Sequence, residues 1–246
     1  SSDVCSSDLS NIQDVLGEAV CKVETYGYLD GADWLIGDYR FESGFGYFSL
    51  SYQGEKKVDF QLAMIGRHNV ENATAVAALC LRLGLTADEI NSAFKTFQGI
   101  KRRQEVVGVK NDITVLDDFA HHPTAIRLTL EAVKEAYPGQ RLLAVFEPRS
   151  ATSKRKVFEQ DFPDSFLVAD KVIIAGLFAP EKIIEEERLN PDQVVTRLRQ
   201  KGCDAHFIKE VDDIVAFMAE NAESGDVVLV MSSGGFGGIH QKILDR

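Results

Sequence analysis

Short apolar runs alternate with amphipathic segments through residues 100–246, and this alternation limits the folds that the chain can adopt. The apolar runs are residues 113–117, 142–146, 172–175, 206–208 and 227–231. Between them, residues 123–137 place Ile126, Leu130, Val133 and Tyr137 on one helical face, and residues 212–220 and 239–244 behave similarly. Strands joined by helical crossovers form a mostly parallel sheet that helices cover. We therefore predict an α/β fold for this part of the chain.

The preceding residues predict a smaller set of elements. Two strand-like runs, residues 44–52 and 57–63, flank the turn signal Gln53-Gly54-Glu55. A helix is expected from Asn69 to a stop at Gly84, with a buried stripe made of Val70, Ala73, Val76, Cys80 and Leu83. A capping box, Thr86 to Glu89, begins a second helix with the stripe Ile90, Phe94 and Phe97. Gly99-Ile100-Lys101 is the candidate boundary, so the expected domains are residues 10–98 and 99–246.

Composition excludes several classes of function. A formal charge of -11 argues against a general nucleic-acid surface, which needs a basic face, and Lys101-Arg102-Arg103 is too short a run to change this. Four widely spaced cysteines predict neither a zinc site nor a disulfide framework, so a reduced, cytoplasmic setting is expected. No apolar run approaches the roughly 18 residues that span a bilayer. Residues 1–9, SSDVCSSDL, are expected to be a non-native or disordered leader.

Three polar loops are expected to meet at one edge of the parallel sheet. Right-handed crossovers place every strand-to-helix loop on the same edge, where open parallel sheets bind their ligands. The loops there are residues 117–123 (DDFAHHP), 147–153 (EPRSATS) and 232–240 (SSGGFGGIH). By contrast, the loop after Ala175 is mostly apolar. The sequence therefore predicts a ligand site built from these three loops.

Asp117 and Asp118 could accept the two hydroxyls of a ribose or hold a metal. His121 and His122 could contact phosphate or act as a general base, and equally one Asp could cap a turn while one His packs on the sheet. Adjacent side chains on an extended segment point in opposite directions, so the two histidines are poor joint ligands of one ion. No H-E-x-x-H run completes such a site, and we expect no metal here.

The glycine loop, residues 234–238, and the loop around Arg149 offer groups that suit anions. Bare backbone amides before a helix suit phosphate or carboxylate, although the same glycines could only serve a tight turn. Their spacing does not fit the G-x-G-x-x-G dinucleotide fingerprint. Arg149 offers forked donors beside three hydroxyls, those of Ser150, Thr152 and Ser153, or else belongs to a solvated surface loop.

Taken in order, five motifs resemble the Mur ligase family: residues 66–72, 101–105, 117–123, 146–152 and 234–240. The strings DDFAHHPTAI and MSSGGFGGIHQKIL resemble the murein peptide ligase branch more than the branch that adds L-alanine. The resemblance implies a Rossmann-like C-terminal domain at residues 99–246 that binds the incoming peptide. Residues 10–98 would be the C-terminal part of the central ATP-binding α/β domain.

The family activates a carboxylate with ATP as an acyl phosphate, which an amine then attacks to give an amide. This branch would join UDP-N-acetylmuramic acid to the murein tripeptide L-alanyl-γ-D-glutamyl-meso-diaminopimelate, in peptidoglycan recycling and cell-wall biogenesis. The resemblance implies that the adenine contacts are Asn69 and Asn72, beside His68. It likewise implies that Arg103 reaches the ATP phosphates and that Asp118 accepts from the ribose. The tripeptide would be held by His121, His122, Arg149, Ser150, Thr152, Ser153, Gly234, Gly235, Gly237, Gly238 and His240.

One departure from the family limits these expectations. No G-x-x-x-x-G-K-[ST] phosphate loop occurs in this sequence, and the family's Mg²⁺ ligands are expected outside it. We therefore expect this chain, a monomer, not to catalyse ligation alone. A free-standing nucleotide- or peptide-binding module and an L-alanine-adding relative remain open. A nicotinamide oxidoreductase would need an acidic residue about 20 positions beyond the glycine loop, and the sequence in hand stops at Arg246.

Overall fold

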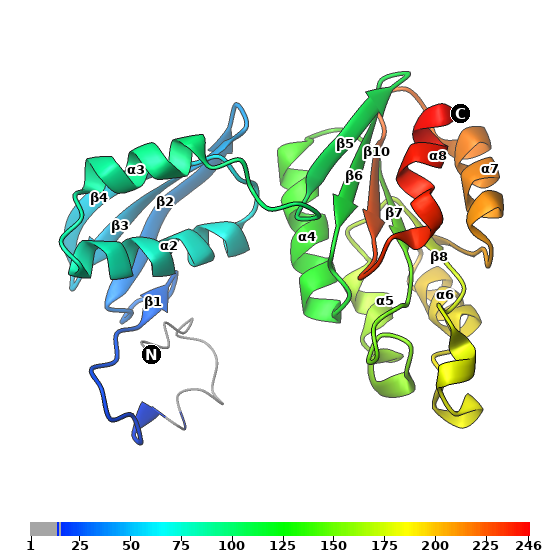
Figure 1. Cartoon of the computed structure of the whole chain (residues 1–246), viewed down its shortest axis with the longest axis horizontal. Helices are drawn as coiled ribbons and strands as arrows, with labels where there is room; N and C mark the ends of the chain where they lie inside the picture. Colours follow the sequence, from blue (N-terminus) through cyan, green and yellow to red (C-terminus); the bar gives the residue numbers. More distant parts are fainter. Residues whose placement is uncertain (1–13, 15) are drawn as a thin grey trace. The chain divides into compact units, whose positions relative to one another are not determined.

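The chain folds into two compact units that divide between Gly99 and Ile100 (Figure 1). The computed structural model describes residues 14 and 16–246, so the leader expected at residues 1–9 lies outside it. Each unit has its own sheet and its own hydrophobic core. We describe the units separately.

Unit 1 is a four-stranded sheet with two helices on one face (Figure 1). Its elements are β1 (Tyr26–Gly27), β2 (Trp34–Glu42), β3 (Phe45–Tyr52), β4 (Glu55–Leu62), α2 (Arg67–Arg82) and α3 (Ala87–Thr96). The predicted turn between β3 and β4 is confirmed. Gln53 and Gly54 have φ values of 48° and 82°, the left-handed pair that closes a two-residue hairpin.

The predicted buried stripe of α2 is partly wrong. Val70 and Ala73 are buried, but Val76 is 52% exposed and Leu83, just past the helix, is 72% exposed. The helix instead turns small side chains toward the sheet, since Thr74, Ala77 and Ala78 are buried. Small residues allow a helix to approach a sheet closely, and here they form part of the buried face in place of Val76 and Leu83.

The start of α3 follows the prediction. The Thr86 side chain accepts from the Glu89 amide, and the Glu89 carboxylate accepts from the Thr86 amide, which completes the capping box. Ile90 is buried as expected. Phe97 is 42% exposed because the helix ends at Thr96, one residue before it.

Unit 2 is a six-stranded sheet with helices on both faces (Figure 1). The strands are β5 (Glu105–Lys110), β6 (Ile113–Asp118), β7 (Leu142–Phe146), β8 (Lys171–Ile174), β9 (Asp204–Phe207) and β10 (Val227–Met231). The helices are α4 (Pro123–Ala136), α5 (Phe162–Ser165), α6 (Pro191–Gln200), α7 (Val211–Asn221) and α8 (Ile239–Asp245), with short 3-10 turns η1 (Lys156–Phe158), η2 (Pro180–Lys182), η3 (Glu185–Glu187) and η4 (Phe236–Gly238).

The strand order β5-β6-β10-β7-β8-β9 is parallel except at β5. The last strand, β10, inserts between β6 and β7, and every residue of β7 and β10 is buried. Such uninterrupted apolar strands are typical of a parallel sheet with both faces covered. The predicted mostly parallel α/β fold of this part is therefore confirmed.

Strand β5 and helices α5 and α6 of unit 2 were not predicted from the sequence, and neither were β1 and β2 of unit 1. Strand β5 lies antiparallel at the edge of the sheet, with Val106 and Val109 more than half exposed and a bulge before Gly108. Its glycine and its irregular register hide the strand pattern. Helix α6 has a low apolar content, although its start carries Asn190, whose side chain accepts from the Gln193 amide, followed by Pro191 in the first turn.

Candidate functional site

The three predicted polar loops begin at adjacent positions of the unit 2 sheet. Met231, the last residue of β10, is in register with Asp118 of β6 on one side and with Phe146 of β7 on the other. The carboxyl ends of these strands therefore form one rim, from which the loops 119–122, 147–155 and 232–238 leave. We call this edge the rim.

Arg149 is held on the rim by three groups. Its guanidinium carbon lies 3.5 Å from the centre of the Phe178 ring, and its Nη1 lies 3.5 Å from Glu147 Oε1. A Cβ on Gly234 would lie only 1.9 Å from Arg149 Nε, so only glycine fits against this side chain. The Arg149 side chain remains 26% exposed. The Arg149 guanidinium therefore has a defined position, and part of it remains accessible for a bidentate contact with an anion.

Buried hydrogen bonds link the β7 and β10 loops beneath Arg149. Ser232 Oγ, which is fully buried, donates to Glu147 Oε2 at 2.5 Å. The same hydroxyl accepts from the Gly234 amide at 2.9 Å. Neither Glu147 nor Ser232 was predicted as a site residue, although each directly follows a predicted strand.

The hydroxyls of the Arg149 loop are mostly engaged within the loop. Ser153 Oγ accepts from the Arg149 amide (3.1 Å) and from Ser150 Oγ (2.8 Å), and Ser153 is fully buried. Thr152 is exposed. Ser150 and Ser153 thus shape the loop that carries Arg149, and Thr152 is the more accessible of the three predicted hydroxyls.

The glycine loop is fixed by an aromatic anchor. Phe236, Gly237 and Gly238 have φ values of 41°, 58° and 71°, three consecutive left-handed residues. Phe236 is 1% exposed and belongs to the core cluster beneath α7 and α8, together with Ile239. Phenylalanine rarely adopts a positive φ, so burial of its ring offsets the strain of this turn.

Asp118 lies inside the rim rather than on it. It is 2% exposed, and its oxygens accept from the amides of Ala120 (2.7 Å) and Gln104 (2.9 Å). Burial raises the pKa of this carboxyl above its usual range, against the opposing effect of those amides. Arg103, the predicted phosphate contact, lies over the Phe119 ring at 5.4 Å. Asp118 thereby fastens the segment that bears Arg103 to the end of β6.

Asp117 is the more accessible carboxylate of the pair. Its Oδ2 accepts from Arg102 Nε at 3.2 Å, and its Oδ1 lies 3.3 Å from His240 Nε2. Burial would raise the Asp117 pKa, but His240 and Arg102 together outweigh burial and lower it. His240, at the start of α8, therefore meets Asp117 on the rim, as the sequence placed it.

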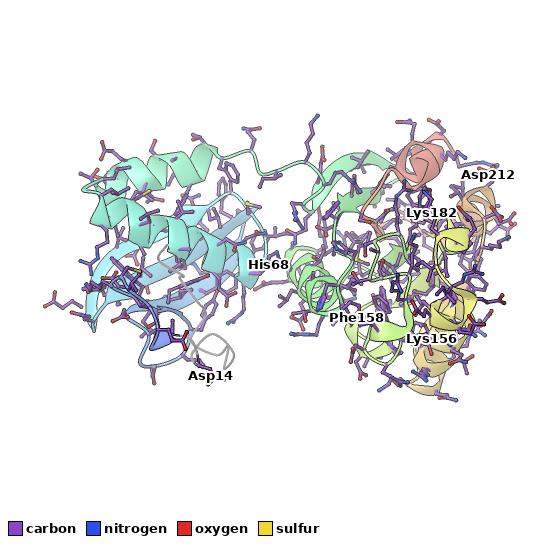
Figure 2. All side chains as sticks on the ribbon, turned by 60° about the horizontal axis from the view of Figure 1, so that its bottom comes forward. Asp14, His68, Lys156, Phe158, Lys182 and Asp212 are labelled. Carbon is purple, nitrogen blue, oxygen red and sulfur yellow. The ribbon has the colours of Figure 1, made fainter. Side chains whose placement is uncertain are left out.

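The two adjacent histidines take separate places. His121 Nδ1 lies 2.9 Å from the Phe119 carbonyl oxygen. His122 is the N-cap of α4: its Nδ1 accepts from the Thr124 amide, and its ring meets Phe158 edge-on at 4.6 Å. Figure 2 labels Phe158 on η1, next to α5, and its ring also packs against Phe162 of that helix. Both histidines have structural contacts, each with different groups.

In unit 1, the predicted adenine contacts lie at the start of α2, where Figure 2 labels His68. Asn69 is 9% exposed, and its Nδ2 donates to the Ile65 carbonyl at 2.7 Å. Asn72 is exposed, so its amide can still both donate and accept. The neighbouring Arg67 guanidinium lies 5.2 Å and 5.0 Å from the ring centres of Tyr28 and Tyr39. The assignment of adenine to this end of the helix remains a prediction.

Unit 2 thus gathers most of the predicted site residues on one rim, together with Arg102, Glu147, Phe178 and Ser232, which were not predicted. Phe178 was missed because its loop looks apolar, although an aromatic ring is a good partner for arginine. A separate cavity of about 270 Å³ lies at the opposite edge of the sheet, lined by residues such as Ile113, Met218 and Leu244. No predicted site residue lines it.

Two negative findings concern residues 14 and 16–246. Within that part of the chain, no group of three or more His, Cys, Asp or Glu side chains could hold a metal ion. None of the helices described there is both long and apolar enough to cross a membrane.

Comparison with known proteins gives two family matches. Residues 102–234 match the glutamate ligase domain of Mur ligases, and residues 4–80 match the Mur ligase middle domain. A curated relative is the UDP-N-acetylmuramate–L-alanine ligase of Caldanaerobacter subterraneus subsp. tengcongensis. It is 35% identical over 99% of this chain and 52% of its own length. The chain spans about half the length of the curated relatives it matches.

Two solved structures extend the likeness. The murein peptide ligase of Psychrobacter arcticus is 29% identical, with a TM-score of 0.67 over 98% of this chain and 50% of that one. The UDP-N-acetylmuramate–alanine ligase of Thermotoga maritima, at 21% identity, shows the shared fold, with a TM-score of 0.76 over 91% of this chain and 47% of that one. The glutamate ligase domain alone covers more than half of the sequence, and the chain therefore belongs to the Mur ligase family.

Proposed function

We propose that this chain is part of an ATP-dependent ligase that forms an amide between the carboxylate of UDP-N-acetylmuramic acid and an incoming amine. The observation that carries the proposal is Arg149, placed by Gly234, Phe178 and Glu147 at the carboxyl ends of the parallel strands. A fixed guanidinium at this edge suits a carboxylate of the incoming amino acid or peptide.

In the proposed reaction, the sugar carboxylate takes the γ-phosphoryl group of ATP, which leaves as ADP. The amine then attacks the acyl phosphate, and the amide forms as inorganic phosphate leaves. Mg²⁺ would neutralise charge on the phosphates. We propose His68, Asn69 and Asn72 of unit 1 as contacts of the nucleotide base and, separately, Arg103 of unit 2 as a contact of the phosphates; Asp118 was predicted to accept from the ribose.

These residues differ in what they can offer to a nucleotide. Asn72 has an accessible amide for the adenine edge. Asn69 already donates to a carbonyl, and both Asp118 oxygens already accept amides. We therefore assign Asp118 to holding Arg103 in place, and we propose the rim around Arg149 as the peptide site.

We further propose that the incoming amine is the murein tripeptide. The strings DDFAHHPTAI and MSSGGFGGIHQKIL support it, as does the likeness to the Psychrobacter arcticus murein peptide ligase over nearly the whole chain. L-alanine is the second candidate, because the curated relative described above is an L-alanine ligase. Residues 10–98 would then be the C-terminal part of the central domain, and residues 99–246 the C-terminal domain, of a cytoplasmic, monomeric enzyme of cell-wall recycling.

Calorimetric titration of the 246-residue chain tests the site and the substrate together. Wild type should bind the tripeptide more tightly than L-alanine, and Arg149→Ala should weaken tripeptide binding at least tenfold. Arg127→Ala, which removes an exposed arginine paired with Glu131 on α4, is the control. Binding of L-alanine alone would move the assignment to the second candidate, and binding of neither would refute the proposal. With ATP, tripeptide and UDP-N-acetylmuramic acid, this chain alone should give no product.

A further inference from the structure

Arg102 stands at the start of unit 2, and its backbone is fixed on both sides. Its amide donates to Glu105 Oε2 at 2.8 Å, and its carbonyl accepts from the Phe119 amide at 2.9 Å. The residue has a left-handed φ of 61°, which arginine rarely adopts.

The Arg102 guanidinium reaches the backbone of the β10 loop. Its Nη2 donates to the carbonyl oxygens of Ser232 (2.5 Å) and Gly234 (2.7 Å). Charge-assisted bonds of this kind are stronger than bonds between neutral groups, and the planar guanidinium fixes their directions. Gly234 is therefore held from two sides, since Arg149 packs against the position where its Cβ would be.

The same guanidinium also reaches the element that follows the glycine loop. Arg102 Nε donates to Asp117, and Asp117 in turn meets His240 on α8. The glycine loop is thus tied at its beginning through two carbonyls, and just past its end His240 Nε2 lies 3.3 Å from Asp117 Oδ1. Arg102 thus commits its Nε and Nη2 donors to protein groups, and its side chain remains 31% exposed.

From this geometry we propose that Arg102 is a positioning residue, which holds the glycine loop and, through Gly234, the Arg149 side chain in the arrangement that receives the incoming amine. Its functional part rests on the function proposed above. The positioning itself is a property of unit 2 and can be measured without any substrate.

Amide hydrogen exchange in the 246-residue chain tests the positioning. Arg102→Ala should speed exchange in peptides covering residues 232–239 by about tenfold or more, with β8 and α6 unchanged. Arg102→Lys should give a smaller increase, because one ammonium cannot reproduce the planar fork. Unchanged exchange at 232–239, or an equal increase throughout unit 2, would overturn the proposal.

Tripeptide titration of the same variants tests the consequence for binding. Arg102→Ala should weaken binding about tenfold or more, Arg102→Lys should recover part of it, and the control Arg127→Ala should match wild type. Faster loop exchange with unchanged tripeptide affinity would overturn the link to binding. If wild type bound neither tripeptide nor L-alanine while the exchange result held, the proposed function would fail and the positioning role of Arg102 would stand.

Discussion

Replacement of Gly234 by alanine is expected to damage the rim while leaving the fold intact. A Cβ at this position would lie 1.9 Å from Arg149 Nε, 2.3 Å from its Cζ and 2.4 Å from its Cδ. These distances are far inside van der Waals contact, so Arg149 must move. Because arginine is long and its side chain is partly exposed, it can leave without unfolding the sheet.

The magnitude follows from the contacts that Arg149 would lose. Its stacking on Phe178 is worth about 1–2 kcal/mol at a partly desolvated site. The contact with Glu147, at 3.5 Å, adds at most about 1 kcal/mol at this exposure. We therefore expect Gly234→Ala to lower the free energy of unfolding of unit 2 by about 1–3 kcal/mol. A displaced guanidinium should also weaken tripeptide binding by about 10- to 100-fold.

The neighbouring glycine provides a matched control. No atom lies within 4 Å of a Cβ built on Gly235, and its φ of -75° is open to any residue. Gly235→Ala should therefore be neutral, or stabilising by about 0.4–1 kcal/mol through the unfolded chain. Urea unfolding should be followed by far-ultraviolet circular dichroism, since the single tryptophan, Trp34, lies in unit 1 and does not report on unit 2.

Equal effects of the two substitutions on the free energy of unfolding would refute this reasoning. So would wild-type tripeptide affinity in Gly234→Ala, because the structure leaves no room for Arg149 beside an alanine. A loss of more than about 4 kcal/mol would also contradict it, since that size belongs to a broken core rather than to a displaced surface arginine.

Two further predictions concern unit 1. Val70 and Val76 lie on the same helix, but Val70 is fully buried and Val76 is 52% exposed. Val70→Ala should therefore lower the free energy of unfolding by about 1–3 kcal/mol, and Val76→Ala by less than about 0.5 kcal/mol. Similar losses in urea titrations followed by Trp34 emission would contradict the packing of α2. Glu24 loses favourable hydration on burial, but hydrogen bonds from Arg82, Lys22 and Trp34 outweigh this and lower its pKa to about 2. The contribution of Glu24 to the stability of unit 1, about 1–2 kcal/mol after solvent screening, should therefore be fully present above about pH 4.5 and disappear as the pH falls toward 2. Glu24→Gln should flatten the pH dependence of unit 1 stability over that range. An unchanged slope would rule this contribution out.

The parallel sheet could be predicted from the sequence because its central strands are buried on both faces and therefore consist of uninterrupted apolar residues. The predicted bounds of β7 and β10 agree with the structure, and β6 extends one residue further, to Asp118. These strands fix where the polar loops begin, so the rim could be predicted with them. The edge strand β5 and helix α6 were not predicted, because β5 is interrupted by a bulge before Gly108 and α6 has few apolar residues.

Side-chain roles within the rim were less predictable than its location. Arg102 and Arg103 are adjacent in a basic run, and nothing in that run shows that Arg102 turns back to two carbonyls. Asp117 and Asp118 are likewise indistinguishable in sequence, yet only Asp118 is enclosed by backbone amides. These differences in side-chain role arise from contacts between segments that are distant in the chain, and the local sequence around each residue does not predict such contacts.

The buried ring of Phe236 has a consequence for ligand affinity. Three consecutive left-handed residues would be costly to order each time a ligand arrived, if the turn were otherwise mobile. With the ring in the core, the turn cannot relax unless the phenylalanine leaves its cluster. The entropy of ordering this segment is therefore lost once, when unit 2 folds, and an arriving ligand meets a preorganised backbone.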